Sequence, residues 1–182
     1  MQLYQTQGYE QTTAADIAAE AGVTQRTFFR HFPDKREVLF GGEDEFIDAL
    51  TSAVVSAPQE LSPLEALLHA FPSVEPLFIK NRPFTAPRQR IIADQPALQE
   101  RAQTKARAVM SALTAAFRQR GVPDRSASLA AQVGMAAFGH AVAAWFESKS
   151  TDLSDHVEQA FKELRDLASF APASGRETEA LR

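Results

Sequence analysis

The stretch TAADIAAEAGVTQRTFFRHFP, residues 13–33, contains the start and stop signals of two short helices. Thr13 and Asp16 have the spacing of a capping box, in which each side chain bonds to the backbone N–H of the other residue, so a helix is expected to begin there. Gly22 favours the left-handed backbone that ends helices. Thr24 is a good N-cap for a second helix. The sequence therefore predicts two short helices joined by a tight glycine turn.

The second of these helices is expected to have an apolar inner face and a polar outer face. Phe28 and Phe32 are four residues apart, so their rings point the same way and can anchor the helix. The outer face carries Gln25, Arg26, Thr27 and Arg30. A helix braced in this way can enter the major groove of DNA, where Gln and Arg form paired hydrogen bonds with base edges. The alternative for the two arginines is an ordinary solvated surface.

The overall composition is typical of a globular helical protein. Of the 182 residues, 45% are hydrophobic, which is enough for a core, and the apolar residues recur at helical spacing. There is no cysteine, so disulfides and thiolate metal sites are excluded. No apolar run reaches the roughly 20 residues of a membrane span. The start of the chain lacks the pattern of a signal peptide. We therefore expect a soluble, cytoplasmic protein with no membrane partner.

The distribution of charge supports a nucleic-acid partner better than the net charge does. The net charge is −4, whereas phosphate contacts require Lys and Arg. Residues 24–36, however, have a local charge of +3, from four cations against one carboxylate: Arg26, Arg30, Lys35 and Arg36 against Asp34. A protein can be acidic overall provided that the surface facing DNA is basic.

Helix signals continue to the C-terminal end. Asp34 and Glu37 have the spacing of another capping box and are expected to start a third segment. Residues 62–65, SPLE, combine a capping box with proline at the first helical position. Residues 72–87 contain four prolines, so the helices there are expected to be short and kinked. Long helices are expected over residues 96–120, 126–148 and 152–170.

Four motifs follow one another in the first 40 residues: Gly8-Tyr9-Glu10-Gln11-Thr12-Thr13, Ile17-Ala18, Ala21-Gly22-Val23-Thr24, and Thr27-Phe28-Phe29-Arg30-His31-Phe32-Pro33-Asp34-Lys35. In this order and spacing they closely resemble the head of the TetR (tetracycline repressor-like) family. The resemblance implies an all-α homodimer, a palindromic DNA operator and an effector pocket in a variable C-terminal body. We expect DNA contacts from Thr13, Thr24, Gln25, Arg26, Thr27, Phe29, Arg30, His31 and Lys35.

Two features of this chain differ from the family pattern. Family members usually have several more residues before the position of Met1, so we expect the first helix to be truncated and the DNA affinity of the chain as given to be reduced. The family more often has Tyr at the position of Phe29, where the hydroxyl reaches a phosphate. Phe29 cannot make that hydrogen bond, which is worth about 1 kcal/mol.

The resemblance also implies that the last two long helices pair with those of a second subunit in a four-helix bundle. The segments 126–148 and 152–170 lie at the corresponding place. The first is apolar or small almost all round, as a helix buried on every side must be. We expect the dimer interface to include Ala130, Gly134, Ala137, Ala141, Trp145, Val157, Phe161 and Leu164. The alternative is a helix buried only within its own subunit.

The body is expected to contain an effector pocket, because kinked helices pack poorly against long ones and leave cavities. The candidate lining residues are Phe71, Phe78, Phe84, Arg88, Ile92, Met110, Phe117, Met135, Phe138 and His140. For any single apolar residue, a place in the core is favoured, and the pocket is predicted from the set as a whole. His140 can equally be a hydrogen-bonded interface residue. The seven basic residues within 80–107 are either a solvated face or, at Arg88 and Arg90, a site for an anionic group such as a carboxylate or an acyl-CoA phosphate.

The predicted organisation is a DNA-binding head at 1–45, a ligand-binding and dimerisation body at 46–170 and a disordered tail at 171–182. We predict a transcriptional repressor that a small hydrophobic or amphipathic effector releases from its operator. Nothing in the sequence indicates an enzyme, a metal site or a cofactor, since the four histidines are scattered and no Gly-rich phosphate loop is present. The alternative is a helical small-molecule- or partner-binding protein with weak or lost DNA binding.

Overall fold

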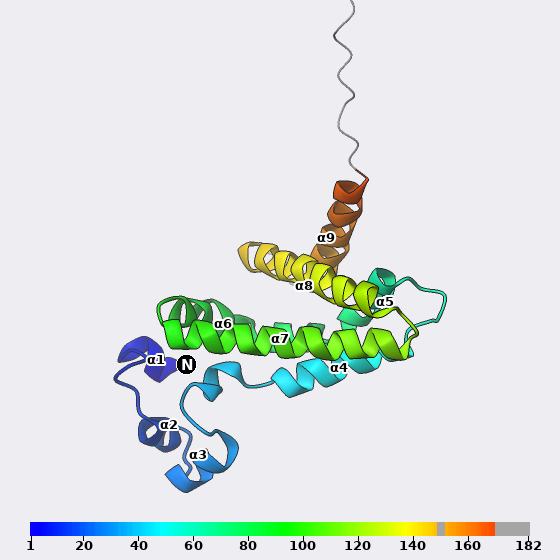
Figure 1. Ribbon diagram of the computed structural model, residues 1–182. Coiled ribbons are helices and arrows are strands. Elements are labelled where there is room, and N and C mark those ends of the chain that lie inside the picture. The colour runs from blue at the N-terminus through cyan, green and yellow to red at the C-terminus, as the bar shows by residue number, and fades with distance from the viewer. Residues whose placement is uncertain (149–151, 170–182) are drawn as a thin grey trace, which may run out of the picture.

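The computed structural model describes residues 1–148 and 152–169, and these ranges contain helices and no strand, as predicted (Figure 1). Three short helices form the head: α1 (Gln2–Thr6), α2 (Ala14–Glu20) and α3 (Gln25–His31). Six longer helices form the body: α4 (Glu43–Ser56), α5 (Pro63–Ala70), α6 (Glu75–Ala93), α7 (Pro96–Gln119), α8 (Asp124–Glu147) and α9 (Leu153–Ala168). Short 3₁₀ turns occupy Glu37–Phe40 and Phe71–Ser73. The predicted tail lies outside the described residues.

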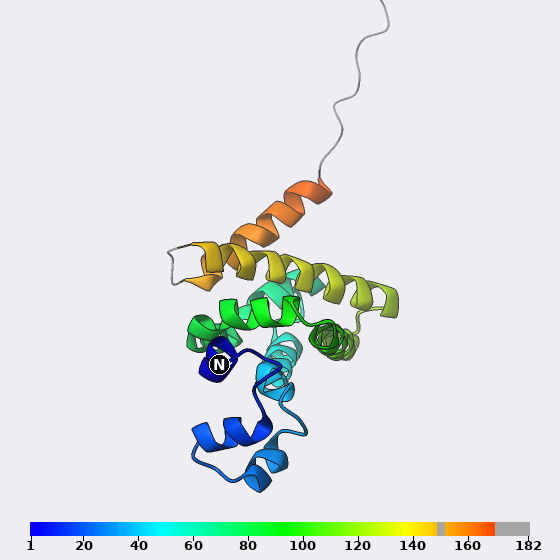
Figure 2. The same ribbon diagram turned by 90° about the vertical axis from the view of Figure 1, so that its left-hand side faces the viewer.

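The head and the last helix lie at opposite ends of the molecule. In both views α2 and α3 lie below the body, and α9 projects from its far side (Figures 1 and 2). Between them, α4 runs along α7, and α8 packs against α5, α7 and α9. By length and composition alone α8 could cross a membrane, but these contacts are those of a helix within a globular body.

The caps predicted at Thr13, Thr24 and Ser62 are confirmed. Thr13 Oγ1 accepts a hydrogen bond from the backbone N–H of Asp16 at 3.1 Å, and the Asp16 carboxylate accepts one in return. Thr24 Oγ1 accepts from the N–H of Thr27 at 3.1 Å. Ser62 and Glu65 complete the same reciprocal box at α5. Gly22 lies at φ +66° between α2 and α3, the backbone region for which glycine was predicted. These local bonds define the helix-turn-helix.

The prediction of short kinked helices over 72–87 is wrong. Residues 75–93 form the single helix α6, which contains Pro83 and Pro87. Pro76 causes no break because it lies in the first turn, where its missing N–H would have no helical partner. Pro83 and Pro87 are four residues apart, so both missing hydrogen bonds fall on the same side of the helix and the other side remains continuous. The helix therefore survives, weakened along one side.

Two apolar clusters hold the chain together. The main core lies in the body, where the rings of Phe71 and Phe138 stack at 4.3 Å and Trp145 is fully buried. The second cluster joins head and body: its buried members are Tyr4, Leu39 and Leu98, with Met1, Tyr9, Ile17, Phe40, Ile91 and Ile92 packed against them. The head is thus docked on α6 and α7 by a small core of its own.

The small residues of α8 allow a close approach within the body. A Cβ atom added at Gly134 would lie 2.2 Å from Leu67 Cδ2, so this approach occurs between α8 and α5 of the same chain. Six of the residues expected at the dimer interface are buried within the chain: Ala130, Gly134, Ala141, Trp145, Val157 and Phe161. The other two, Ala137 and Leu164, are half-exposed. The interface itself stays a prediction.

The C-terminal end of α4 is fixed by one arginine. The guanidinium of Arg120, just after α7, donates hydrogen bonds to the backbone carbonyls of Val54 at 3.1 Å, Ala57 at 2.5 Å, Pro58 at 2.7 Å and Leu61 at 3.4 Å. The last carbonyls of a helix have no partner within the helix, so a charged donor placed there stabilises its end. This end of α4 is therefore attached to α7 and to the start of the loop before α5.

Candidate DNA-binding helix and ligand pocket

Helix α3 is anchored by phenylalanine and exposes its polar side. Phe28 is buried, and its ring lies 5.4 Å from that of the half-buried Phe32, so the predicted anchor is confirmed. The polar residues Gln25, Arg26, Arg30 and His31 are exposed, and Phe29 is 48% exposed. Arg30 Nη2 lies 3.4 Å from His31 Nε2. The face that sequence analysis assigned to DNA is accessible, while the contacts themselves stay a prediction.

The predicted threonines lie at the N-terminal ends of the two helices. Thr13 and Thr24 are exposed caps, and the hydroxyl of Thr27 lies 3.0 Å from that of Thr24. Their hydroxyls therefore sit beside the free backbone N–H groups of α2 and α3. Such N–H groups are common phosphate ligands. This placement is compatible with the predicted backbone contacts.

Lys35 forms hydrogen bonds within the protein that were not predicted from the sequence. Its ammonium donates hydrogen bonds to three backbone carbonyls, those of Tyr9 at 2.8 Å, Glu10 at 3.2 Å and Thr12 at 3.0 Å, and lies 4.4 Å from the Tyr9 ring centre. Tyr4 adds to this junction by donating its phenolic O–H to the Lys35 carbonyl at 2.7 Å. Burial raises the pKa of the Tyr4 phenol, so the proton stays on the donor.

Because of these contacts, not all of the cations predicted within residues 24–36 face outward. The three N–H groups of Lys35 point at carbonyls, so a phosphate bond from Lys35 would replace one of them. Arg36 Nη2 is paired with Asp34 Oδ2 at 2.5 Å, and this hydrogen bond holds the pKa of Asp34 below its usual value. The exposed cations of α3 that remain are Arg26 and Arg30.

A cavity of about 360 Å³ lies where the head joins the body. Three segments that are far apart in the sequence form its wall: the linker from the head into α4, one face of α6, and the N-terminal half of α7. We call residues 37–43 the linker. The apolar part of the cavity wall includes Phe40, Phe46, Leu77, Phe78, Ile92, Ala102, Ala106 and Val109. The polar part of the cavity wall includes Glu43, Glu45, Lys80, Asn81, Thr85, Arg88, Gln89 and Lys105. We call this cavity the linker pocket.

Arg88 is the pocket's least satisfied charge. Its Nη1 atom donates to the linker carbonyl of Leu39 at 3.4 Å, a long hydrogen bond, and its buried Nε has no hydrogen-bond partner among the described residues. Burial lowers the pKa of the Arg88 guanidinium, because a low dielectric disfavours the charged form. A buried guanidinium with little compensation favours an anionic ligand.

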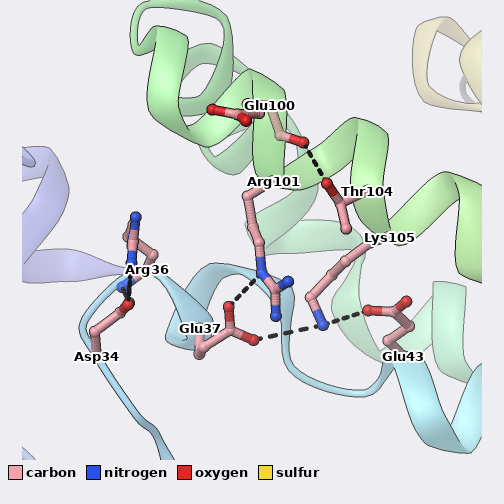
Figure 3. A network of polar contacts seen from close by, with 8 residues as sticks. All are labelled: Asp34, Arg36, Glu37, Glu43, Glu100, Arg101, Thr104 and Lys105. Carbon is pink, nitrogen blue, oxygen red and sulfur yellow. Dashed lines mark hydrogen bonds and ion pairs between the residues drawn. The ribbon is translucent and has the colours of Figure 1, made fainter.

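A second set of charges binds the linker to α7 (Figure 3). Arg101 Nε donates to Glu37 Oε1 at 2.6 Å, and Lys105 Nζ lies 3.4 Å from Glu37 Oε2 and in closer contact with Glu43 Oε2. The hydrogen bond from Arg101, helped by the charge of Lys105, lowers the pKa of Glu37. The capping box predicted for Asp34 and Glu37 is therefore wrong, since the Glu37 side chain turns to α7.

The predicted pocket residues are spread over several places. Phe78, Arg88 and Ile92 line the linker pocket. Phe71 and Phe138 line another cavity of about 400 Å³ beside α9 and lie in the main core. Phe117 is fully buried in the core, Met135 packs against it, and Met110 is half-buried. Phe84 is 51% exposed, and exposed His140 lies 3.5 Å from Glu163 of α9. None of the last five lines either cavity.

Sequence analysis missed the linker's share of the pocket. Phe40 and Glu43 of the linker, and Phe46 in the first turn of α4, were not among the predicted lining residues, and Lys105 was counted only within the basic residues of 80–107. The sequence did contain one indication of this contact. Arg101 and Lys105 are four residues apart and therefore lie on one face of a helix, where they can pair with acidic residues such as Glu37 and Glu43.

Comparison with known families matches both parts of the chain. Residues 1–40 match the sequence model described as bacterial regulatory proteins, tetR family. Residues 61–168 match the model described as the MftR C-terminal domain. The first match covers the three head helices, and the second runs from the start of α5 to the end of α9.

Three individual proteins are similar to this chain. The HTH-type transcriptional regulator TcmR of Streptomyces glaucescens is 39% identical over 74 residues, which are 41% of this chain and 33% of TcmR, so the match spans about a third of that relative. A crystal structure of Thermus thermophilus FadR, a TetR family transcriptional repressor in complex with lauroyl-CoA, has a TM-score of 0.58 at 22% identity, covering 98% of this chain and 95% of FadR. The TetR family regulator PfmR, also from Thermus thermophilus, has a TM-score of 0.49 at 21% identity, covering 90% and 93%. The FadR match shows a shared fold.

Proposed function

The chain belongs to the TetR family of bacterial regulatory proteins, and from this premise we propose that it is a dimeric repressor that leaves a palindromic operator when an amphipathic, anionic effector binds. The observation that carries the proposal is the position of the linker pocket. Its wall includes Phe40 and Ile92, which also belong to the apolar cluster that docks the head on the body. A ligand in this pocket would contact the joint that orients α3.

On the DNA side, α3 would lie in the major groove. Arg26 and Arg30 are the candidates for contacts with guanine or phosphate, and Gln25 is the candidate for adenine. Two copies of α3 in a dimer would be separated by about one turn of DNA, roughly 34–36 Å. An effector that prefers a different separation would shift the population away from DNA, by no more than its difference in affinity between the two states.

The proposed effector class follows from the pocket lining. Aromatic and aliphatic side chains would take an apolar chain, while Arg88, with Lys105 and Lys80 nearby, would take a carboxylate or phosphate. A volume of about 360 Å³ is within the range of small-molecule sites. FadR, which shares the fold, was crystallised with lauroyl-CoA, so acyl compounds are reasonable first probes.

The proposed dimer would use the face of α8 and α9 that the body leaves uncovered. Leu129 on α8 is 62% exposed and Leu167 on α9 is 74% exposed, and half-exposed Ala137 and Leu164 lie on the same helices. Large exposed apolar residues on two adjacent helices favour an interface. We further propose that the protein works in the cytoplasm and has no enzymatic activity, as befits a transcriptional regulator.

Selection of bound sites from random DNA tests the proposal. We expect a palindrome to be enriched, with half-sites about one helical turn apart. The double variant Arg26→Ala/Arg30→Ala should lose most of this affinity and flatten its salt dependence, because two phosphate or base contacts disappear. The matched control is Arg125→Ala, an exposed arginine at the start of α8, which should bind normally. If no DNA is enriched with folded protein, the repressor proposal fails and the alternative of a small-molecule- or partner-binding protein is favoured.

A further inference from the structure

Two half-buried cations of the linker pocket, Arg88 and Lys105, also contact the linker. Arg88, on α6, donates to the carbonyl of Leu39. Lys105, on α7, contacts the carboxylates of Glu37 and Glu43. Both cations line the pocket, and all three of these partners belong to the linker. Each cation therefore has one side toward the linker and one toward the space that a ligand would fill.

The bond at Arg88 is weak enough to be exchanged. At 3.4 Å the contact with the Leu39 carbonyl is long, and the carbonyl carries no net charge. A carboxylate or phosphate could accept two parallel hydrogen bonds from the same guanidinium, including one from the buried Nε. Hydrogen bonds between charged groups are about twice as strong as neutral ones. An anion would therefore outcompete the linker for Arg88.

Lys105 would be affected differently by the same anion. Its ammonium is shared by two carboxylates, of which Glu37 has a second partner in Arg101 and Glu43 has no other cation in ion-pair contact among the described residues (Figure 3). A third anion near Lys105 would weaken both contacts. Glu37 would keep Arg101, whereas Glu43, the first residue of α4, would lose its ion-pair partner. The linker would then loosen at its α4 end.

Building on the proposed function, we infer that the effector's anionic group acts by taking Arg88 and Lys105 over from the linker, so that charge exchange, and not the filling of the pocket alone, releases the head. The lining also contains Glu43 and Glu45, opposite Lys80, Arg88 and Lys105. Before the exchange Glu43 is paired with Lys105, and Glu45 is exposed, so neither opposes the arrival of an anion at Arg88. Once the anion shares Lys105, repulsion between the anion and the Glu43 carboxylate would push the start of α4 away from the pocket. An uncharged ligand of the same length fills the same space but leaves both tethers intact.

Hydrogen exchange tests the tethers without DNA or ligand. In Arg88→Met and in Lys105→Met, backbone amides of residues 39–43 should exchange about tenfold faster than in the wild type, because one charged contact to the linker is lost. Arg107→Met, at an exposed arginine of the same helix α7, is the matched control and should leave the linker unchanged. Circular dichroism and protection of α9 report on folding, and Arg88→Gln, which removes the charge but stays polar, serves if Arg88→Met does not fold. Unchanged linker exchange in folded variants at both positions would overturn the inference.

A pair of probes tests the exchange itself. Dodecanoate and 1-dodecanol have the same chain length and differ in charge, and both are used below the concentration at which dodecanoate forms micelles. Dodecanoate should accelerate linker exchange in the wild type and in Arg107→Met but not in Arg88→Met, and dodecanol should have no effect. If the two probes act equally, or if dodecanoate leaves the wild-type linker unchanged, the inference is wrong.

The same probes separate this inference from the proposed function. With selected operator DNA, dodecanoate should release the protein at a concentration at least about tenfold below that of dodecanol, and Arg88→Met should remove the difference. If the protein binds its operator and the two probes release it at equal concentrations, charge exchange is contradicted and the proposed repressor function still holds. If the protein binds no DNA but dodecanoate still accelerates hydrogen exchange in the linker, the proposed repressor function is contradicted and charge exchange still holds.

Discussion

Lys35 shows how one side chain can differ from the role that its charge predicts. Sequence analysis placed it on phosphate, and the structure directs its three N–H groups at the carbonyls of Tyr9, Glu10 and Thr12. These carbonyls lie in the turn between α1 and α2, where a helix end and a loop leave acceptors without partners. Lys35 therefore joins the beginning of the head to its end, and any contribution to DNA binding comes on top of this role.

Replacing Lys35 should therefore lower the stability of the fold, whatever its effect on DNA binding. We expect Lys35→Met to lower the free energy of unfolding by about 1.5–3 kcal/mol, the usual worth of hydrogen bonds to a charged group. The neighbouring Arg36→Met loses only an exposed ion pair, so it should lower the free energy of unfolding clearly less than Lys35→Met does. Urea denaturation followed by circular dichroism compares the two. Equal losses in both variants would contradict the structural role of Lys35.

Glu37 gives the joint between head and body a dependence on pH. Its pKa is lowered in the folded protein, chiefly by Arg101, so its contribution to stability is complete above the ordinary carboxyl pKa of about 4.3 and is lost as the pH falls through the lower folded value. The difference in melting temperature between the wild type and Glu37→Gln should be constant above about pH 5 and shrink below about pH 4. Glu60→Gln, at an exposed carboxylate, is the control. If the difference in melting temperature grows toward low pH, the pKa of Glu37 is not lowered by folding, and the prediction is wrong.

Individual helices were predictable where their signals are local. Capping boxes at Thr13 and Ser62 and the stop at Gly22 act within four residues, so the sequence alone placed those ends. Helix α6 was not predictable in this way, because it contains Pro83 and Pro87, which locally favour a break, and its contacts with α7 are not visible in a local pattern. Tertiary contact overrides local propensity in such cases.

The candidate site was only partly predictable for the same reason. The exposed face of α3 follows from helical spacing within a nine-residue segment. The linker pocket is assembled from three segments whose separation in sequence exceeds any periodic pattern, so only its α6 members Phe78, Arg88 and Ile92 were named in advance. The packing of α8 on α5 was not predicted, because small residues indicate a close approach but not which helix approaches.

The contact of α8 with α5 allows a matched test at two glycines. We expect Gly134→Ala to destabilise the fold by about 1–3 kcal/mol, because the new methyl group would overlap the fully buried Leu67. Gly139→Ala, on the same helix, meets nothing within 4 Å and should be neutral or stabilise by up to about 1 kcal/mol. Thermal denaturation measures both changes. Stabilisation of both variants would refute the close approach.

At the scale of the whole molecule, the head and the projecting end of α9 face in opposite directions (Figures 1 and 2). A dimer formed through α8 and α9 would therefore leave both heads uncovered on the other side. This arrangement lets one surface bind a second subunit while the other meets DNA, and it makes the oligomeric state testable apart from DNA binding.

Charge placed on the open face of α9 should separate the subunits. We expect Leu167→Glu to convert a dimer to a monomer, because two buried carboxylates would face each other across a twofold interface. Ile79→Glu on α6 is the matched control, since Ile79 is also exposed, by 50%, but lies on a different face. Light scattering after gel filtration gives the mass of each variant. A dimeric Leu167→Glu, or a monomeric Ile79→Glu, would place the interface elsewhere.

The four carbonyl bonds of Arg120 determine how α4 can respond to events in the linker pocket. With its C-terminal end pinned, the helix works as a lever whose fulcrum is Arg120 and whose free arm ends at Glu43. The arm is about 21 Å long, at 1.5 Å per residue, so a tilt of about 5° sweeps its tip by about 2 Å. In the proposed repressor, a shift of that size at the tip would move the linker and the head, so a modest rearrangement of Arg88 and Lys105 would change the separation between the two α3 helices.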